Sequence, residues 1–451
     1  MTAFTSCNPA TGEVVFTRAA WPHDQLPGCL ARLRQAQAEW ARLDIEERAG
    51  RMMRLADQLM QHRQALADLV TLEVGKRTAE CLAEIDKSEK LIRYYASLAP
   101  SLLQPLMIPT NGSRSGVAFE PLGTVLAVMP WNYPIWQVLR FAVPALMAGN
   151  ACLVKPAPVV PQSTQLLLDC VHQAGLAVLD IAWIDHDQVE QAIRLSDAVA
   201  FTGSTATGRH LASLAGRHLK KTVLELGGSN PFIVLADADV DAAAREAVHS
   251  RFRDAGQSCN AAKRMIVVPE VAERFMTTFV AEAAALRAGA PTDPDTTLSP
   301  LTRSDLRAGL HAQVLDALAN GATLRLGGEM PTGPGFFYPA TVLDHVNPGC
   351  RVYREEVFGP VASILRARDE QDAVRLANDT PFGLGASIYS NDTARAWELA
   401  RQLQAGSVFI NRHTSSDLRL PFGGVKDSGY GRELSEFGLY EFVNVKTYWQ
   451  K

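Results

Sequence analysis

The feature that most constrains the fold of this chain is a regular alternation of short apolar segments with amphipathic ones, which begins near Gly123. An apolar run over residues 124–128 comes before a helical pattern over 136–148, and another over 151–154 comes before a helical pattern over 161–174. Strands that alternate with helices predict βαβ units, which build a parallel sheet with helices on its faces. The fold class that we predict is therefore α/β.

The alternation continues along the chain and defines a second α/β block over residues 232–405. A short strand over residues 198–201 and a helix over 207–215 complete the first block. Strands of the second block are expected at residues 265–268, 322–325, 361–365 and 407–410. Upstream of both blocks, apolar side chains at helical spacing predict helices over residues 30–79 and 79–96.

Two segments predict β-structure outside these blocks. Asn111 and Gly112 form a dipeptide typical of tight hairpin turns, so the flanking residues 103–109 and 113–120 are expected to form a β-ribbon. Residues 443–449 alternate apolar and polar side chains as a strand does. An unpaired strand of this kind would promote aggregation. We expect it to pair with another strand, which another subunit could supply.

Composition and charge exclude several classes of function. The 451 residues carry 44 Lys and Arg against 48 Asp and Glu, a formal net charge of −4 that gives no electrostatic footprint for nucleic acid. No apolar run of about 18 residues predicts a membrane span, and the first residues lack the pattern of a signal peptide. The 7 cysteines are widely spaced, which favours reduced thiols in a cytoplasmic protein and predicts no metal site.

Cys259 is the first candidate for a nucleophile. Small and polar neighbours in the segment GQSCNAAKR, residues 256–264, could leave its thiol accessible. Lys263 and Arg264 add positive charge, and such surroundings lower the pKa of a thiol and favour the reactive thiolate. A buried structural cysteine is the alternative, and this segment alone does not decide between the two.

Glu225 and Asn132 are candidates for supporting roles. Glu225 stands between two leucines and before two glycines, so burial would raise the pKa of its carboxyl and suit it to general base catalysis. Asn132 lies between Trp131 and Tyr133 in a turn bounded by prolines, where its amide could stabilise an oxyanion. The alternatives are a strand edge that faces water for Glu225 and an ordinary turn for Asn132.

Residues 203–208, GSTATG, form a candidate phosphate site. They follow a short apolar strand and open a helix, whose N-terminal amides could bind a phosphate. The segment lacks the G-x-G-x-x-G fingerprint, so a plain strand-to-helix turn is the alternative.

Taken together, these segments resemble the NAD(P)-dependent aldehyde dehydrogenase superfamily over essentially the whole chain. The segments that carry the resemblance occur in the family's order and spacing: residues 8–13 (NPATGE), 130–134 (PWNYP), 201–205 (FTGST), 224–228 (LELGG), 256–264 (GQSCNAAKR), 355–360 (EEVFGP), 421–424 (PFGG) and 428–433 (SGYGRE).

The resemblance implies an architecture of three parts. A parallel-sheet domain that binds the cofactor would comprise residues 1–102 and 122–227, and an α/β catalytic domain would comprise residues 228–427. A small β-ribbon and a tail, residues 103–121 and 428–451, would mediate assembly into a homodimer or a homotetramer.

The resemblance also implies a role for each matching residue. Cys259 would be the nucleophile, Glu225 the general base, and Asn132 the oxyanion donor beside the backbone N–H of Cys259. The cofactor would be NAD(P)+, with Lys155 on the adenosine ribose and Glu356 on the nicotinamide ribose. The other residues implied around it are Trp131, Gly203, Ser204 and Phe358. The thiolate would attack an aldehyde, a hydride would leave to the nicotinamide, and the base would activate water to release the acid.

A segment that follows Asn132 indicates the class of substrate. Trp136 and Arg140 are four residues apart and would share one face of a helix, and arginine suits a carboxylate. Residues 415–421 (SSDLRLP) resemble a loop of short succinate-semialdehyde dehydrogenases. The resemblance therefore implies succinate semialdehyde, with its carboxylate held by Arg140 and Ser416. A structural salt bridge or a subunit contact is the alternative for Arg140.

The choice between NAD+ and NADP+ stays open. Pro158 stands three residues after Lys155, where relatives that prefer NAD+ often carry a glutamate. No carboxylate at this position would repel a 2′-phosphate, so NADP+ is permitted.

Three alternative functions are distinguishable from the residues. An enzyme that transfers the acyl group to coenzyme A would not need Glu225, and a catalytically silent relative would be expected to lack one of the three catalytic residues. An enzyme for neutral aliphatic or aromatic aldehydes would tolerate the loss of Arg140.

Overall fold

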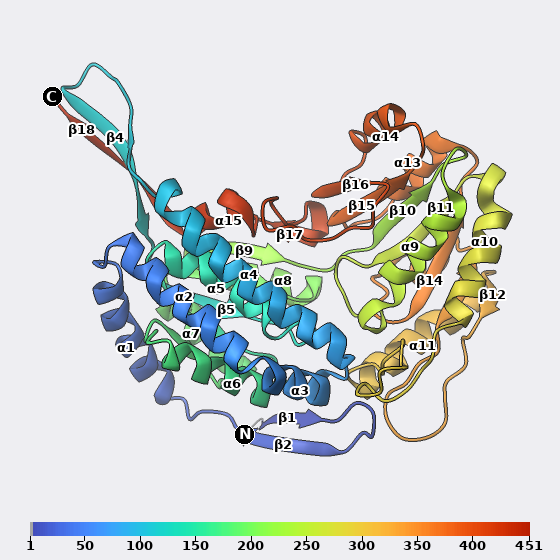
Figure 1. The fold of residues 1–451 in the computed structure, drawn as a ribbon, viewed down its shortest axis with the longest axis horizontal. Coiled ribbons are helices and arrows are strands. Elements are labelled where there is room, and N and C mark those ends of the chain that lie inside the picture. Colours follow the sequence, from blue (N-terminus) through green and yellow to red (C-terminus); the bar gives the residue numbers. More distant parts are fainter. Residues whose placement is uncertain (1–2) are drawn as a thin grey trace.

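Two sheets built mainly from parallel strands form the framework of the molecule, and an antiparallel ribbon projects from it (Figure 1). A computed structural model describes residues 3–451. Within these residues, each of the two larger sheets has its own apolar core of buried side chains. The two α/β blocks that the sequence predicts thus correspond to two separate sheets.

The first sheet has six strands in the order β17-β9-β8-β5-β6-β7, of which only β17 is antiparallel to its neighbour. Its strands are β5 (Thr124–Val128), β6 (Ala151–Lys155), β7 (Leu179–Ile181), β8 (Ala198–Thr202), β9 (Lys221–Glu225) and β17 (Gly429–Tyr430). The chain runs outward from β5 to β6 and β7, then returns to the other side of β5 with β8 and β9. The order of strands therefore reverses between β5 and β8, and ligands of open α/β sheets bind at such a point.

Helices surround this first sheet. The sequence predicts helical structure over residues 30–79, and the structure divides this region into three helices because residues 41–44 and His62 interrupt the pattern. The helices are α1 (Gln25–Trp40), α2 (Ile45–Gln61), α3 (Arg63–Val74), α4 (Thr78–Leu102), α5 (Trp136–Met147), α6 (Pro161–Gln173), α7 (Val189–Leu195) and α8 (Thr205–Arg217), with a short 3-10 helix η1 (His186–Gln188).

The second sheet has seven strands in the order β12-β13-β14-β11-β10-β15-β16, and only β12 is antiparallel to its neighbour. Its strands are β10 (Asn230–Val234), β11 (Ala262–Val267), β12 (Thr323–Leu326), β13 (Thr341–Asp344), β14 (Val361–Arg366), β15 (Gly385–Tyr389) and β16 (Ser407–Ile410). The associated helices are α9 (Val240–Phe252), η2 (Arg253–Gly256), α10 (Pro269–Ala284), α11 (Ser304–Ala319), α12 (Arg351–Arg354), α13 (Glu370–Asn378) and α14 (Thr393–Ala400).

The projecting ribbon contains the C-terminal strand, which the sequence predicts to pair with another strand. It consists of β3 (Leu106–Met107), β4 (Arg114–Pro121) and β18 (Val443–Gln450), in the order β18-β4-β3. The C-terminal strand β18 pairs along its whole length with β4 of the same chain, so no second subunit is needed to satisfy it. Figure 1 shows this ribbon extending away from the body of the molecule, with the C-terminus at its tip.

The remaining elements connect these parts. They are the N-terminal hairpin β1 (Ala3–Cys7) and β2 (Val14–Ala19), the 3-10 helix η3 (Lys426–Ser428) and the helix α15 (Ser435–Tyr440). Within residues 3–451, no helix combines the length and the apolar character that crossing a membrane requires.

Candidate active site

The first cavity of the site opens at the carboxyl ends of the strands where the order reverses. Trp131 follows β5, Lys155 ends β6, and Gly203 and Ser204 follow β8, and all four line this cavity of about 460 Å³. Ser204 is the N-cap of α8, and its hydroxyl accepts a hydrogen bond from the N–H of Thr207 at 3.3 Å. The helix therefore presents its N-terminus to the cavity, where an anion is stabilised.

Lys155 is buried, and its ammonium group makes only one long hydrogen bond among the described residues. Its ammonium group donates to the carbonyl of Pro156 at 3.5 Å and lies 5.9 Å from the centre of the Phe4 ring. Burial lowers the pKa of Lys155 to about 8. Pro158 lines the same cavity in the turn after β6, and its place near the adenosine stays a prediction.

The opposite wall of this cavity comes from the second α/β block. Glu356 and Phe358 line it, and the Phe358 ring meets the Trp131 ring edge to face, with centres 5.8 Å apart. The carboxylate of Glu356 pairs with Lys263 and accepts the N–H of Gly228 at 3.1 Å. A side chain at Gly227 would clash with this carboxylate, since a Cβ there would lie 2.4 Å from Glu356 Oε2.

Cys259 lies in a loop whose backbone is held in a strained conformation. Asp254, Ala255 and Gly256 precede it with φ values of 51°, 52° and 71°, and the first two cost energy because L-residues rarely adopt them. A Cβ at Gly256 would lie 2.4 Å from the carbonyl oxygen of Gly359, so only glycine fits. Asp254 is fixed by an ion pair with Arg253 at 3.1 Å and by a hydrogen bond from the hydroxyl of Tyr133.

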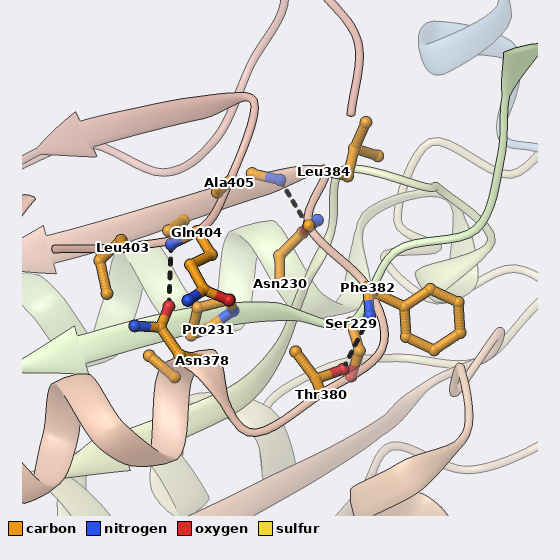
Figure 2. Close-up of a pocket in the computed structure, with 14 residues that line it drawn as sticks. Ser229, Asn230, Pro231, Asn378, Thr380, Phe382, Leu384, Leu403, Gln404 and Ala405 are labelled. Atoms are coloured by element: carbon orange, nitrogen blue, oxygen red, sulfur yellow. Dashed lines mark hydrogen bonds between the residues drawn. The ribbon is translucent and has the colours of Figure 1, made fainter. Parts of the chain in front are cut away.

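Asn230 anchors the other end of this loop. Its amide nitrogen donates to the carbonyls of Cys259 and Ala261, at 2.9 Å and 3.1 Å. Figure 2 shows Asn230 among the residues at the start of β15, where its Oδ1 accepts the N–H of Gly385 at 3.0 Å. The cysteine loop is therefore fixed to the second sheet by one side chain. The small pocket drawn there has a volume of about 10 Å³, too little for an organic ligand.

Asn132 is buried and faces the same cavity as Cys259. Its amide nitrogen donates to the carbonyl of Gln257 at 3.0 Å. A primary amide has two N–H groups, so a second donor is left for an oxyanion on the substrate.

Glu225 and Cys259 are neighbours, and the carboxylate and the thiol shift each other's pKa. Glu225 is 2 % exposed at the end of β9, and burial raises the pKa of its carboxyl to about 7, so the alternative of a strand edge that faces water is excluded. The expectation for Cys259 was wrong: burial and the neighbouring Glu225 hold the pKa of the thiol well above its ordinary value. Arg264 does not offset this because it donates to the backbone carbonyls of Ser229, Leu376 and Ala377.

Lys263 has the expected effect in direction but not in size. It lowers the pKa of Cys259, although Glu356 already neutralises its ammonium group. The free cysteine is therefore a thiol at neutral pH, with a carboxylate beside it that can take its proton.

A second cavity, of about 410 Å³, meets the first at the cysteine. Trp136, Arg140 and Ser416 line it together with Cys259, so the structure brings all three predicted substrate residues to one space. Among the described residues, Cys259 and Gln137 are the two that line both cavities. The reactive sulfur thus lies between the two cavities and can face a ligand in each.

Arg140 is engaged by two carboxylates. Its guanidinium is 2 % exposed and lies 2.6 Å from Glu433 Oε2 and 3.4 Å from Glu225 Oε2. These carboxylates raise the pKa of Arg140 and keep it charged. This arrangement matches the alternative reading of Arg140 as part of a structural salt bridge, and its contact with a substrate carboxylate stays a prediction.

Sequence reasoning missed four residues of the second cavity or its wall. They are Lys87, Gln137 and Arg253, which line it, and Glu433, which pairs with Arg140. Glu433 ends one of the motifs that carry the family resemblance, so that motif was the available signal. Within residues 3–451, no group of three or more His, Cys, Asp or Glu side chains could hold a metal ion.

The fold and this pairing of a buried carboxylate with a thiol between two cavities define a class of enzyme that acts through a cysteine. The chain matches the Aldehyde dehydrogenase family over residues 1–448. It therefore belongs to the aldehyde dehydrogenase family, as the sequence motifs indicate.

Two curated relatives show which members of this family the sequence resembles. The chain is 44% identical to the succinate semialdehyde dehydrogenase Sad of Escherichia coli, whose name carries NAD(P)+, over 99% of this chain and 97% of that protein. It is 43% identical to a succinate-semialdehyde dehydrogenase of Deinococcus radiodurans, whose name carries NADP+, over 98% of this chain and 94% of that protein.

Two solved structures have the same fold over nearly the whole chain. A succinic semialdehyde dehydrogenase from Streptococcus pyogenes, in complex with NADP+, superposes with a TM-score of 0.96 at 35% identity and covers 99% of each chain. A succinate-semialdehyde dehydrogenase from Burkholderia pseudomallei has a TM-score of 0.96 at 36% identity, over 99% of this chain and 94% of that one. The predicted fold, a family fold with two α/β sheets and a ribbon, is confirmed.

Proposed function

We propose that this aldehyde dehydrogenase oxidises succinate semialdehyde to succinate with NAD(P)+ as its cofactor. The observation that carries the proposal is the position of Cys259 at the junction of two cavities, one suited to a dinucleotide and the other lined by cations. The names of relatives 43% and 44% identical to the chain support the same substrate and cofactor.

The residues of the first cavity fit a dinucleotide. The ammonium group of Lys155 has one carbonyl partner at 3.5 Å, so it can donate to the hydroxyls of a ribose. The N-terminus of α8, with Gly203 and Ser204, suits a pyrophosphate. Pro158 carries no charge, so both NAD+ and NADP+ are permitted. When bound, the nicotinamide supplies the acceptor for a hydride.

The side chains around Cys259 account for the other steps. Glu225 takes the thiol proton, and the sulfur then bonds to the aldehyde carbon to give a thiohemiacetal whose oxyanion receives the free N–H of Asn132. One such donor contributes about 3–4 kcal/mol to the transition state. Loss of the hydride leaves a thioester on Cys259. Glu225 then releases the thiol proton to solvent and deprotonates a water molecule. The resulting hydroxide adds to the thioester carbon and the carbon–sulfur bond breaks, which releases the acid and restores Cys259.

The proposal extends to assembly and location. We expect a cofactor domain of residues 1–102 and 122–227, a catalytic domain of 228–427, and a homodimer or homotetramer joined through residues 103–121 and 428–451. Apolar side chains exposed on the ribbon support an interface there. A cytoplasmic location is supported by seven cysteines that are all free thiols.

The experiment is a turnover assay without coenzyme A. Purified protein is incubated with succinate semialdehyde and either NAD+ or NADP+, and the reduced cofactor is followed by absorbance. Turnover with at least one cofactor is expected, and the ratio of kcat/KM for the two measures the choice that Pro158 leaves open. A requirement for coenzyme A would instead indicate acyl transfer.

A second candidate function is oxidation of neutral aldehydes. The ion pairs of Arg140 favour it, since this cation is already neutralised by Glu433 and Glu225. Turnover of butanal with no turnover of succinate semialdehyde would establish this second function and overturn the first.

A further inference from the structure

Helix α4 places a lysine in the cavity beside the reactive cysteine. The ammonium group of Lys87 donates a hydrogen bond to the hydroxyl of Ser416 and lies 4.2 Å from the centre of the Trp136 ring. All three side chains line the cavity that contains Cys259. Among residues 3–451, no carboxylate forms an ion pair with Lys87.

Arg140, the other buried cation of the cavity, is in a different state. It lies between Glu433 at 2.6 Å and Glu225 at 3.4 Å, so its charge is already balanced or exceeded by theirs. A third carboxylate brought to this guanidinium would be repelled by the two already present. It would also have to replace contacts that Arg140 already makes.

Arg253 lies at the edge of the cavity and is also engaged. Its Nε is 3.1 Å from a carboxylate oxygen of Asp254, and its side chain is 47% exposed. Asp254 and Glu80 further stabilise its charge. Of Lys87, Arg140 and Arg253, only Lys87 is partly buried and has no carboxylate in an ion pair with it. Burying an unpaired cation costs free energy, which binding of an anion would recover.

We propose that Lys87, positioned by Ser416, binds the distal carboxylate of the substrate and makes the enzyme select an aldehyde that carries an acid group. This inference rests on the proposed function and assigns its selectivity to a residue of α4 and not to Arg140. The neighbouring hydroxyl of Ser416 offers the carboxylate a second donor. The ring of Trp136 excludes water from one side of the ammonium group.

The proposal has a consequence for pH. Burial and the charges of Arg140 and Arg253 lower the pKa of Lys87 to about 8, against the opposing effect of Cys259 and Asp417. These groups lie on α5, in η2, in the cysteine loop and in the loop after β16, and the same cavity is also lined by Glu80 and Glu84 of α4 and by Arg77 and His249. Deprotonation above pH 8 would remove the cation, so KM for succinate semialdehyde is expected to rise there, while KM for butanal stays level.

The test compares K87M, K87R and the control K90M. Lys90 lies on the same helix and is exposed, so K90M removes the same charge outside the cavity. Each protein is assayed with succinate semialdehyde and with butanal, which has the same number of carbons and no acid. Succinate is also tested as a competitive inhibitor of butanal oxidation. K87M is expected to lower kcat/KM for succinate semialdehyde about 10- to 100-fold, as expected for loss of a charge-assisted hydrogen bond.

The expected pattern is selective. K87M keeps its activity on butanal and binds succinate more weakly, K87R retains most of the selectivity with the rise of KM shifted to higher pH, and K90M behaves as the parent. An equal loss on both aldehydes, or no change on either, would overturn the role of Lys87. If the parent oxidises butanal alone, the proposed function fails. Inhibition by succinate that K87M weakens would still support the carboxylate site, and inhibition that it leaves unchanged would overturn it.

Discussion

At the scale of single residues, the proposed chemistry depends on the protonation state of Glu225. The carboxyl of Glu225 is buried, and its pKa of about 7 is set by burial and by Glu433 against the opposing charge of Arg140. A carboxylate with this pKa is a far stronger base than an exposed one, yet it is ionised in a useful fraction at neutral pH. Because Cys259 is a thiol under the same conditions, Glu225 can serve both the attack and the hydrolysis.

The first prediction concerns the loss of this base. E225Q is expected to lower kcat about 10²- to 10⁴-fold, the usual range for removal of a general base. In the parent enzyme, kcat should fall about tenfold per pH unit well below pH 7, since only ionised Glu225 accepts a proton. Steady-state rates from pH 5 to 9 give the profile. A flat profile in the parent would contradict the assignment.

The second prediction uses the neighbour of this base. The negative charge of Glu433 raises the pKa of Glu225 and competes for Arg140. In E433Q, Arg140 is left to Glu225 alone, so the pKa of Glu225 should fall and the acid limb of the kcat profile should move to lower pH. The acid limb is expected to shift along the pH axis, whereas the maximal value of kcat is expected to change little. A limb that stays in place or moves upward would show that Glu433 does not control this base.

At the scale of elements, helix α5 is positioned by a side chain far away in the sequence. Glu84 of α4 accepts the N–H groups of Ile135 and Trp136, both at 3.0 Å, and so satisfies the N-terminus of α5. The same carboxylate pairs with Lys76 at 2.7 Å, and both side chains are 1% exposed. This helix carries Trp136, Gln137 and Arg140 into the cavities, so its position determines the shape of the site.

The third prediction tests this support. E84Q removes the charge that Lys76 and the helix N-terminus share, and breaking a buried pair of this kind costs about 3–5 kcal/mol of unfolding free energy. Urea unfolding followed by circular dichroism measures the loss. E89Q is the matched control, because Glu89 pairs with Arg93 at the surface of the same helix and its loss should cost less than about 1 kcal/mol. Similar losses in the two variants would argue against the role of Glu84.

These contacts explain what the sequence could and could not predict. The strand at Thr124–Val128 was predicted with its observed bounds because it follows from a local apolar run. The local pattern at Glu225 left a water-facing strand edge open, and the family resemblance, not the pattern, singled out the residue whose pKa is raised by burial. Lys87 was missed because one lysine on an amphipathic helix looks like any solvated residue until the loop at Ser416 meets it. The pKa of Cys259 was misjudged because charge nearby in the sequence was taken for charge nearby in space.

At the scale of the whole molecule, the ribbon exposes apolar side chains that another subunit could cover. β18 and β4 pair with each other, so their backbone is satisfied within the chain. Their side chains are not covered: Val445, Tyr448 and Trp449 are each at least half exposed, as are Leu106 and Met107 of β3. An apolar surface on a projecting arm is typical of an interface between subunits.

The last prediction follows from the two-residue period of a strand. Val445 and Trp449 lie on the same face of β18, so V445E and W449E together place two charges on one side of the ribbon without disturbing its backbone pairing. If this face joins subunits, light scattering after size-exclusion chromatography should show the mass fall from a multiple of 49.0 kDa towards that of one chain. L315E, which adds a charge at an exposed leucine of α11, should leave the mass unchanged. Cys259, Glu225 and Asn132, the proposed catalytic residues, lie outside the ribbon, so dissociated subunits that still react at Cys259 would separate assembly from the chemistry. An unchanged mass would exclude this face as the interface.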